Sequence, residues 1–261
     1  YGDWSSDVCS SDLIIPYVMP GFQLAKLCAE LFPKLAGPRT IGMALLHHGL
    51  FSFGATAKES YDRMLELVAL AERATTSVPA KVRVAGPPLE IATLRRDVAK
   101  VAGFPVILAV HGDESPANRQ GPVTPDHVLR TKRLPLIGRD VQAYAAEYRQ
   151  YFQQHAGSGL TMLDPAPRVI LDETFGLCTV GRSAKDAGIV ADIYRHTNDI
   201  IRRAEALESW QALPARDIFD VEYWDLEQAK LRKAGSPPMF AGEVALVTGA
   251  ASGIGKACVE S

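Results

Sequence analysis

The pair His47-His48 is the first feature of the chain that could carry chemistry. It ends an apolar run that begins at Thr40, and Gly49 follows it. Neutral imidazole is a common zinc ligand, and a histidine at the end of a buried strand can point its ring into a cleft while the strand holds it rigidly. His48 is therefore a candidate metal ligand. From spacing alone, a histidine that is hydrogen-bonded within the core is the simpler interpretation.

A second candidate is a basic segment with the signals of a helix start. Residues 124–133 read Thr-Pro-Asp-His-Val-Leu-Arg-Thr-Lys-Arg. Thr124 suits a helix cap, and Pro125 suits the first helical position. Helix starts and basic side chains together bind phosphate, so His127 and Arg130 could contact the phosphate of a substrate. A capped surface helix without a ligand explains the same residues, and both interpretations remain open.

A third candidate is a glycine-rich turn at residues 248–255, Thr-Gly-Ala-Ala-Ser-Gly-Ile-Gly, after an apolar run over 243–247. In dinucleotide-binding folds such glycines permit a tight turn, backbone approach to the pyrophosphate and close packing of helix on strand. The cofactor is expected to be NAD or NADP. The residue that selects between the two usually lies about 20 positions later, beyond Ser261, so the choice between them stays open. The residues expected to bind it are Thr248, Gly249, Ser252, Gly253, Ile254 and Gly255.

Hydrophobic periodicity predicts the elements that position these groups. It predicts helices over 21–32, 56–75, 88–102, 138–154 and 183–207, and strands over 40–48, 50–53, 105–110 and 243–247. Pro33 is expected to end the first helix, and the first two strands are expected to form a buried hairpin. This pattern indicates an α/β fold.

One stretch of the sequence is repeated. Residues 49–59, Gly-Leu-Phe-Ser-Phe-Gly-Ala-Thr-Ala-Lys-Glu, align with residues 176–186, Gly-Leu-Cys-Thr-Val-Gly-Arg-Ser-Ala-Lys-Asp. Each copy predicts a strand, a glycine turn and a capped helix. His48 precedes the glycine of the first copy, whereas Phe175 precedes that of the second. Common origin and independent use of a frequent building block both remain open.

Composition excludes several classes of function. A chain of 261 residues with 47% hydrophobic and 22% charged residues is typical of a globular protein. Its net charge of −2 disfavours nucleic-acid binding and binding to anionic membrane surfaces. The four cysteines lack paired spacing, which argues against a disulfide framework and fits a cytoplasmic location. The apolar runs are too short to span a bilayer.

The two ends of the chain are expected to lie outside the main domain. Residues 1–13 are rich in serine and aspartate, show no helical or strand period, and resemble a translated sequencing adapter. A genuine disordered terminus is the alternative. Gly235-Ser-Pro-Pro238 predicts a linker over 236–240, which separates a domain over 14–235 from a second unit over 241–261.

The segment from Met43 to Tyr61 resembles the class II aldolase/adducin family. In that family a strand ends in Asn-His-Gly and supplies the third of three zinc-binding histidines. The resemblance places His48 at that ligand, and His47 stands where the family has asparagine. The other two ligands, in a His-x-His pair, and the catalytic glutamate lie earlier in the family, and nothing between Ile14 and Thr40 matches them.

Four further motifs narrow the resemblance to the bifunctional aldolase/short-chain dehydrogenases, often called rhamnulose-1-phosphate aldolase/alcohol dehydrogenases. The motifs lie at residues 16–21, 121–127, 220–230 and 248–255, so the resemblance covers 14–261. It implies the later part of a class II aldolase/adducin-like domain, followed by the first βα turn of a Rossmann domain. The chain would then be truncated at both ends and inactive by itself.

The resemblance also implies the chemistry. Zn²⁺, or another divalent metal, would promote retro-aldol cleavage of a ketose 1-phosphate to dihydroxyacetone phosphate and lactaldehyde. The dehydrogenase unit would oxidise the aldehyde with NAD or NADP. The implied partners are a small-molecule sugar phosphate and an aldehyde, and a homo-oligomer is possible.

Two other hypotheses are compatible with the sequence. One is an NAD(P)-dependent short-chain dehydrogenase with a non-catalytic, adducin-like binding domain. The other is an adducin-like binding module without enzymatic activity. An accessible His48 favours the aldolase, whereas an occluded His48 favours the alternatives. His111, His155 and His196 lie in polar contexts and are expected to be solvated.

Overall fold

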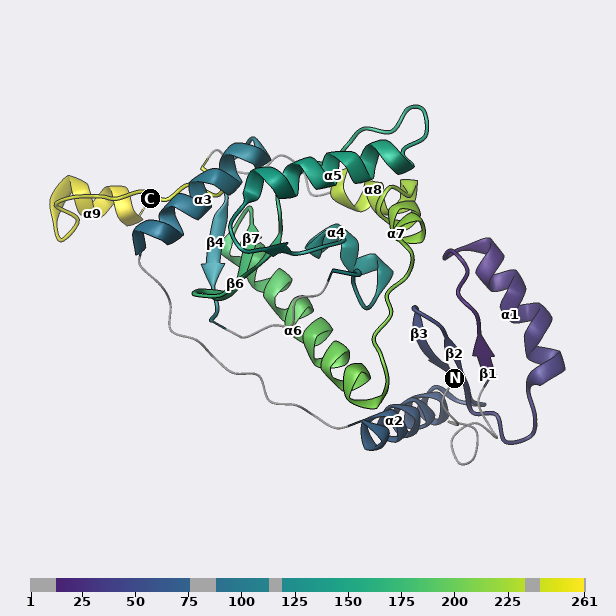
Figure 1. The fold of residues 1–261 in the computed structure, drawn as a ribbon. Coiled ribbons are helices and arrows are strands. Elements are labelled where there is room, and N and C mark those ends of the chain that lie inside the picture. The colour runs from purple at the N-terminus through teal and green to yellow at the C-terminus, as the bar shows by residue number, and fades with distance from the viewer. Residues whose placement is uncertain (1–12, 76–87, 113–118, 233–239, 261) are drawn as a thin grey trace.

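The computed structural model of the protein describes residues 13–75, 88–112, 119–232 and 240–260. These ranges form a mixed α/β structure with two separate sheets (Figure 1). The larger sheet has the strand order β4-β7-β6-β5, in which only β5 and β6 run parallel. Its strands are β4 (Ile107–Val110), β5 (Leu136–Ile137), β6 (Val169–Asp172) and β7 (Gly176–Gly181).

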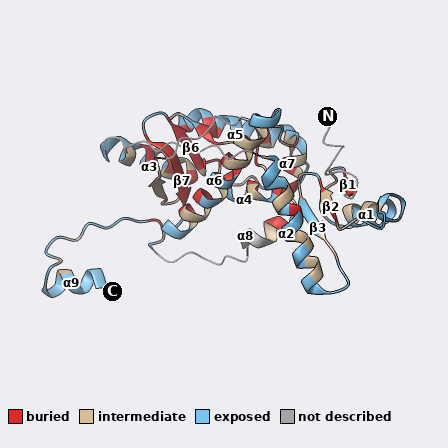
Figure 2. Ribbon diagram, turned by 90° about the horizontal axis from the view of Figure 1, so that it is seen from below, coloured by how far each residue is buried: buried red, intermediate tan, exposed pale blue. Residues whose placement is uncertain are grey.

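Helices cover both faces of this sheet. Side chains of successive strand residues point to opposite faces, so Ile170 packs with Val98 and Tyr144, whereas Val169 packs with Tyr194. The first face is covered by α3 (Pro88–Ala102) and α5 (Val141–His155), and the second by α6 (Ala184–Leu207). The buried residues concentrate in these three layers (Figure 2).

The smaller sheet has the strand order β1-β2-β3. Its strands are β1 (Leu13–Ile15), β2 (Gly42–Leu45) and β3 (Gly49–Ser52), and its helices are α1 (Phe22–Leu35) and α2 (Ala57–Ala74). Leu13, Ile15 and Leu45 form its buried centre, whereas β3 is largely exposed. The predicted hairpin is therefore correct in its pairing and wrong in its burial, because β3 is an edge strand of the described sheet.

The two sheets repeat one order of elements. Each unit contains a strand, a helix, an antiparallel hairpin and a second helix, in the order β1-α1-β2-β3-α2 in one unit and β5-α5-β6-β7-α6 in the other. In both units the first strand of the hairpin runs parallel to the opening strand. The second helices are capped alike, because Thr56 accepts from the Glu59 amide and Ser183 accepts from the Asp186 amide. The predicted repeat of strand, turn and capped helix is thus confirmed as a structural similarity.

Short helices complete the larger unit. They are a 3₁₀ helix, η1 (Pro125–His127), followed by α4 (Val128–Thr131), α7 (Ala215–Glu222) and α8 (Asp225–Arg232). Tyr223, which follows α7, is buried against Tyr148 and Phe219. None of the helices in the described ranges is long and apolar enough to cross a membrane.

Several predicted boundaries are wrong. The helix α1 continues through Pro33 to Leu35, because a proline so close to the helix end removes only one backbone hydrogen bond. Leu13, assigned from sequence to a foreign segment, opens β1 and is buried. The rest of that segment, residues 1–12, lies outside the described residues. So do residues 236–239 of the predicted linker.

The predicted strand over 243–247 is absent from the structure. Val244 and Leu246 are 70% and 92% exposed, and no described strand pairs with this segment. A strand is stable only when a neighbour satisfies its backbone groups, so an apolar run alone does not form one. The predicted helix after it does form, as α9 (Gly253–Glu260).

Candidate functional site

His48 lies in the tight turn between β2 and β3, not at the end of a strand. Its backbone amide donates to the carbonyl oxygen of Leu45 at 2.9 Å. His47 has a φ of 61°, a left-handed conformation that ends β2 three residues earlier than predicted. Asparagine tolerates this conformation better than most residues, which gives a physical reason for the asparagine of the resembling family at this position.

The ring of His48 is oriented by two contacts. Its Nε2 lies 2.8 Å from the carbonyl oxygen of Val18, and the ring of Tyr17 stacks on it with 5.0 Å between centroids. A carbonyl oxygen only accepts, so Nε2 must carry the proton and Nδ1 keeps the free lone pair. Metal-binding histidines are commonly held in this way, with one ring nitrogen donating to a backbone carbonyl and the other binding the metal.

Tyr17 connects this turn to the larger unit. It packs against the cluster of Val128, Ile218 and Val221 from α4 and α7. Burial, together with Asp217 and other nearby carboxylates, raises the pKa of Tyr17 to about 12. Its hydroxyl is buried and has no hydrogen-bond partner in the described part of the chain. A buried polar group of this kind marks a place where a ligand or water is expected.

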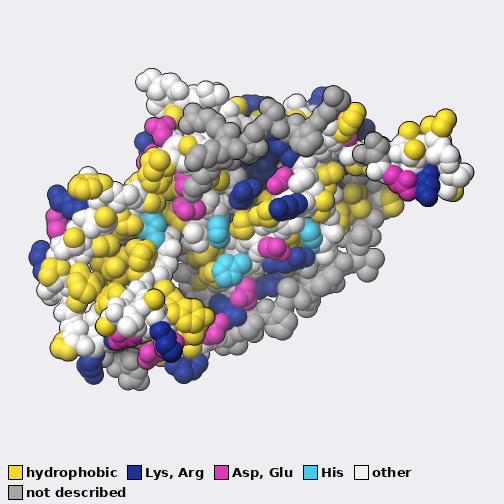
Figure 3. Space-filling model, turned by 180° about the vertical axis from the view of Figure 1, so that it is seen from behind, with side chains coloured by type: hydrophobic (Ala, Val, Ile, Leu, Met, Phe, Trp, Pro, Cys, Tyr) yellow, Lys and Arg dark blue, Asp and Glu magenta, His cyan; other side chains and the backbone are white. Residues whose placement is uncertain are grey.

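His47 and His127 both have lowered pKa values. Burial, followed by His48, lowers the pKa of His47, and burial, followed by His196, lowers that of His127. Nδ1 of His127 is buried without a hydrogen-bond partner among the described residues. Histidine side chains gather near the middle of one face of the molecule, with charged side chains around them (Figure 3).

The two residues of the second predicted site differ in burial. His127 is half-buried in η1, whereas Arg130 is exposed on α4. Thr124, expected to cap this helix, makes no side-chain cap hydrogen bond, and the helix starts as 3₁₀ instead. Phosphate contact by His127 and Arg130 stays a prediction.

The glycine-rich turn has the backbone that its glycines permit. Gly249 and Gly253 have φ angles of 68° and 57°. A Cβ on Gly255 would lie 2.4 Å from the carbonyl oxygen of Gly249, so only glycine allows this close approach. Thr248, Ser252 and Ile254 are exposed around the turn, and their contacts with a cofactor stay predictions.

The described residues supply one candidate metal ligand and not a complete set. They contain no group of three or more histidine, cysteine, aspartate or glutamate side chains that could hold a metal ion. Zinc needs three or four protein ligands. His48 therefore fits a metal only as one member of a set whose other members lie elsewhere.

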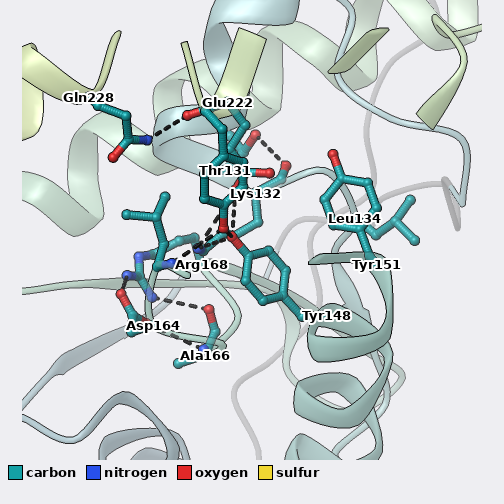
Figure 4. Close-up of polar contacts among 12 residues, drawn as sticks. Thr131, Lys132, Leu134, Tyr148, Tyr151, Asp164, Ala166, Arg168, Glu222 and Gln228 are labelled. Carbon is teal, nitrogen blue, oxygen red and sulfur yellow. Dashed lines mark hydrogen bonds and ion pairs between the residues drawn. The ribbon is translucent and has the colours of Figure 1, made fainter. Parts of the chain in front are cut away.

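Sequence reasoning missed a buried ionic network in the larger unit (Figure 4). Lys132 donates to the Tyr148 hydroxyl at 3.1 Å, and this hydroxyl donates to Oε1 of Glu222 at 2.8 Å. The Lys132 and Glu222 side chains are only 4% and 0% exposed. Burial lowers the pKa of Lys132 to about 8 and raises the pKa of Glu222. The helical spacing of Tyr144, Tyr148 and Tyr151 was visible in the sequence, but nothing there marked Glu222.

Two single histidines also differ from expectation. Nε2 of His111 is hydrogen-bonded to Oγ1 of Thr179 at 2.8 Å, and the His155 ring packs against Tyr151 and Phe219. Both are half-buried, so the prediction that they are solvated is wrong. His196 is exposed, as predicted.

Comparisons with known proteins found two similarities. Residues 106–231 match a family model described as "Aldolase class II, second domain". The chain is also 29% identical over 286 residues to a Bacillus subtilis (strain 168) protein named "Uncharacterized oxidoreductase YuxG". That match covers 93% of this chain but 41% of the relative, so the chain spans about two fifths of its length. No solved structure matches the chain. The two similarities fit an enzyme of class II aldolase and oxidoreductase type.

Proposed function

We propose that the chain is part of a bifunctional enzyme that cleaves a ketose 1-phosphate and oxidises the resulting aldehyde with NAD or NADP. The oriented ring of His48 is the observation that carries this proposal, because it presents one lone pair on a rigid turn. The match to a class II aldolase domain and the similarity to an oxidoreductase support the two halves.

In this proposal His48 is one ligand of Zn²⁺ or another divalent metal, and donors outside the described residues complete the set. When bound, such a metal polarises the substrate carbonyl and stabilises the negative charge that develops as the carbon–carbon bond breaks. Val18 fixes the tautomer of His48, and Tyr17 holds the ring plane. The Tyr17 hydroxyl and Nδ1 of His127 are the unpartnered polar atoms that a substrate would meet.

The glycine-rich turn carries the second half of the proposal. Thr248, Gly249, Ser252, Gly253, Ile254 and Gly255 would contact the pyrophosphate of the dinucleotide at the start of α9. The close approach of Gly255 to Gly249 supports this assignment, because the same approach packs helix against strand in dinucleotide-binding turns.

Metal content and activity of the intact protein test the proposal. We expect about one equivalent of metal per chain, lost in His48→Ala and retained in His47→Asn, which keeps the left-handed turn. Cleavage of a ketose 1-phosphate should disappear with the metal. Unchanged metal content in His48→Ala would refute the assignment of this ligand.

Two observations favour the alternative of an NAD(P)-dependent dehydrogenase with a non-catalytic, adducin-like domain. The described residues hold one candidate metal ligand, and the relative is named for oxidoreductase chemistry alone. An intact protein that reduces NAD or NADP with an aldehyde or alcohol, but binds no metal and cleaves no ketose phosphate, would establish this alternative.

A further inference from the structure

A small cavity lies beside the buried ionic network and has no role in the proposed function. It has a volume of about 30 Å³ and is lined by Arg133, Leu134, Tyr144, Glu147, Tyr148 and Tyr151. Two of the tyrosine hydroxyls are already engaged, since Tyr144 donates to the carbonyl oxygen of Leu134 and Tyr148 donates to Glu222. The cavity therefore offers mainly aromatic rings, the guanidinium group of Arg133 and the carboxylate of Glu147, which pairs with Arg119.

Arg133 is exceptional among the half-buried arginines. Its guanidinium lies 4.8 Å from the centroid of the Tyr151 ring, but it makes no hydrogen bond or ion pair with the described residues. Four other half-buried arginines each donate to a carboxylate or backbone carbonyl oxygen; they are Arg63, Arg95, Arg168 and Arg203. Arg133 thus keeps its planar set of N–H donors available to a ligand.

No described carboxylate forms a salt bridge with Arg133. Glu222, which interacts with Arg133 electrostatically from a longer distance, lies 3.8 Å from Lys132, and Glu147 lies 3.7 Å from Arg119. A guanidinium beside aromatic rings is poorly solvated, and its attraction for an anion is stronger there than in water. The pairing therefore predicts an anion rather than a cation as occupant.

Two further features point to a ligand. Lys132, the residue before Arg133, has φ 62° and ψ 169°, a region that only glycine adopts readily. Such backbone strain concentrates at functional sites and ligand clamps. Behind the tyrosine wall, Oε2 of Glu222 is fully buried without a hydrogen-bond partner in the described structure.

We propose that Arg133 and the tyrosine-lined cavity bind the carboxylate end of a small organic acid. A planar carboxylate matches the fork of two parallel guanidinium donors. A cavity of about 30 Å³ accepts only such an end group, so the rest of the acid would lie outside. The site is separate from His48 and lies within the part of the chain that matches the aldolase second domain.

Titration with acetate at constant ionic strength tests the proposal on the intact protein. We expect saturable binding by calorimetry, with a shift of the Arg133 Nε–H signal in NMR spectra. Arg133→Gln should weaken the binding about tenfold or more, because it removes charged hydrogen bonds. Arg149→Gln is the matched control, since Arg149 is exposed on α5 and does not line the cavity. It should leave acetate binding unchanged.

Arg133→Lys separates geometry from charge. It keeps the positive charge but loses the fork, so intermediate affinity supports a planar carboxylate site. Inorganic phosphate is the competing probe, and tighter binding of phosphate than of acetate would overturn the carboxylate assignment. The proposal would also fail if wild-type protein showed no saturable acetate binding, or if Arg133→Gln bound acetate as well as wild type. All of these readouts are independent of metal content and of aldolase activity.

Discussion

Arg95 joins Gly242 to the large sheet across 147 positions of sequence. Nη2 of Arg95 donates to the carbonyl oxygen of Gly242 at 2.7 Å, and Nε donates to that of Val106 at 2.7 Å. Gly242 has a φ of 79°, and a Cβ there would lie 2.4 Å from the carbonyl oxygen of Pro105. The segment that leads to the glycine-rich turn is therefore fixed against the start of β4.

We predict that Gly242→Ala releases this segment. The added Cβ collides with backbone, so the segment must move away and lose the hydrogen bond from Arg95. Limited proteolysis between Phe240 and Leu246 should become faster. Gly103→Ala is the matched control, because Gly103 has a φ of 78° but open space around its Cβ position. It should cost about 1–2 kcal/mol of strain without exposing the segment. Equal proteolysis in both variants would contradict the prediction.

The left-handed backbone of His47 predicts opposite effects for two substitutions. Asparagine adopts this conformation readily, so His47→Asn should raise the free energy of unfolding by up to about 1 kcal/mol. Valine is β-branched, so His47→Val should lower it by about 1–2 kcal/mol. Urea unfolding measures both. The same pair of substitutions at exposed His196 controls for composition. A turn that tolerates valine as well as asparagine would show that His47 is not held in this conformation.

The buried pair of Lys132 and Glu222 predicts non-additive effects on stability. Lys132→Met should lower the free energy of unfolding by about 3–5 kcal/mol, because it leaves a buried carboxylate without its cation. Adding Glu222→Leu should recover most of that loss, since an apolar pair removes both desolvation costs. Lys100→Met, at an exposed position, should have little effect. Additive single and double variants in urea unfolding would argue against coupling of the two charges.

The same lysine predicts a dependence on pH. Burial lowers the pKa of Lys132 from 10.5 to about 8, so between these values the unfolded chain holds a proton that the folded chain lacks. The free energy of unfolding of wild type, relative to Lys132→Met, should therefore rise as pH increases through this window. A constant difference between the two proteins from pH 8 to 10.5 would contradict the lowered pKa.

Asp172 predicts a second dependence on pH, in acid, where stability again rises with increasing pH. Burial by itself raises the pKa of Asp172, but two hydrogen bonds from Arg139 and those from the Phe175 and Thr174 amides outweigh it and lower the pKa. The stabilisation is present at neutral pH and lost as pH falls through that lowered value. Asp172→Asn should thus cost about 2 kcal/mol at pH 7 and progressively less in acid.

Unfolding at several pH values, with Asp192→Asn as an exposed control, checks this response. Asp192 is paired with Arg195 at 3.9 Å on the surface, where ion pairs contribute little. An acid-independent difference between wild type and Asp172→Asn would show that the aspartate is not held ionised by Arg139.

Local signals in the sequence determined the long helices, their caps at Thr56 and Ser183, and the repeated unit of strand, turn and helix. Such features depend on residues three or four positions apart, which share one helical turn. The resemblance placed His48 at the end of a strand as a metal ligand; the residue lies in the turn after that strand, and its ligand role stays a prediction.

Only the tertiary structure decided which atoms meet. The tautomer of His48 depends on Val18, which is 30 positions away, and the pairing of Lys132 with Glu222 spans 90 positions. The apolar run over 243–247 looked like a strand, yet no described strand pairs with it. Periodicity reports which faces can be buried, but hydrogen-bond partners, charge pairing and sheet formation depend on neighbours that are distant in sequence.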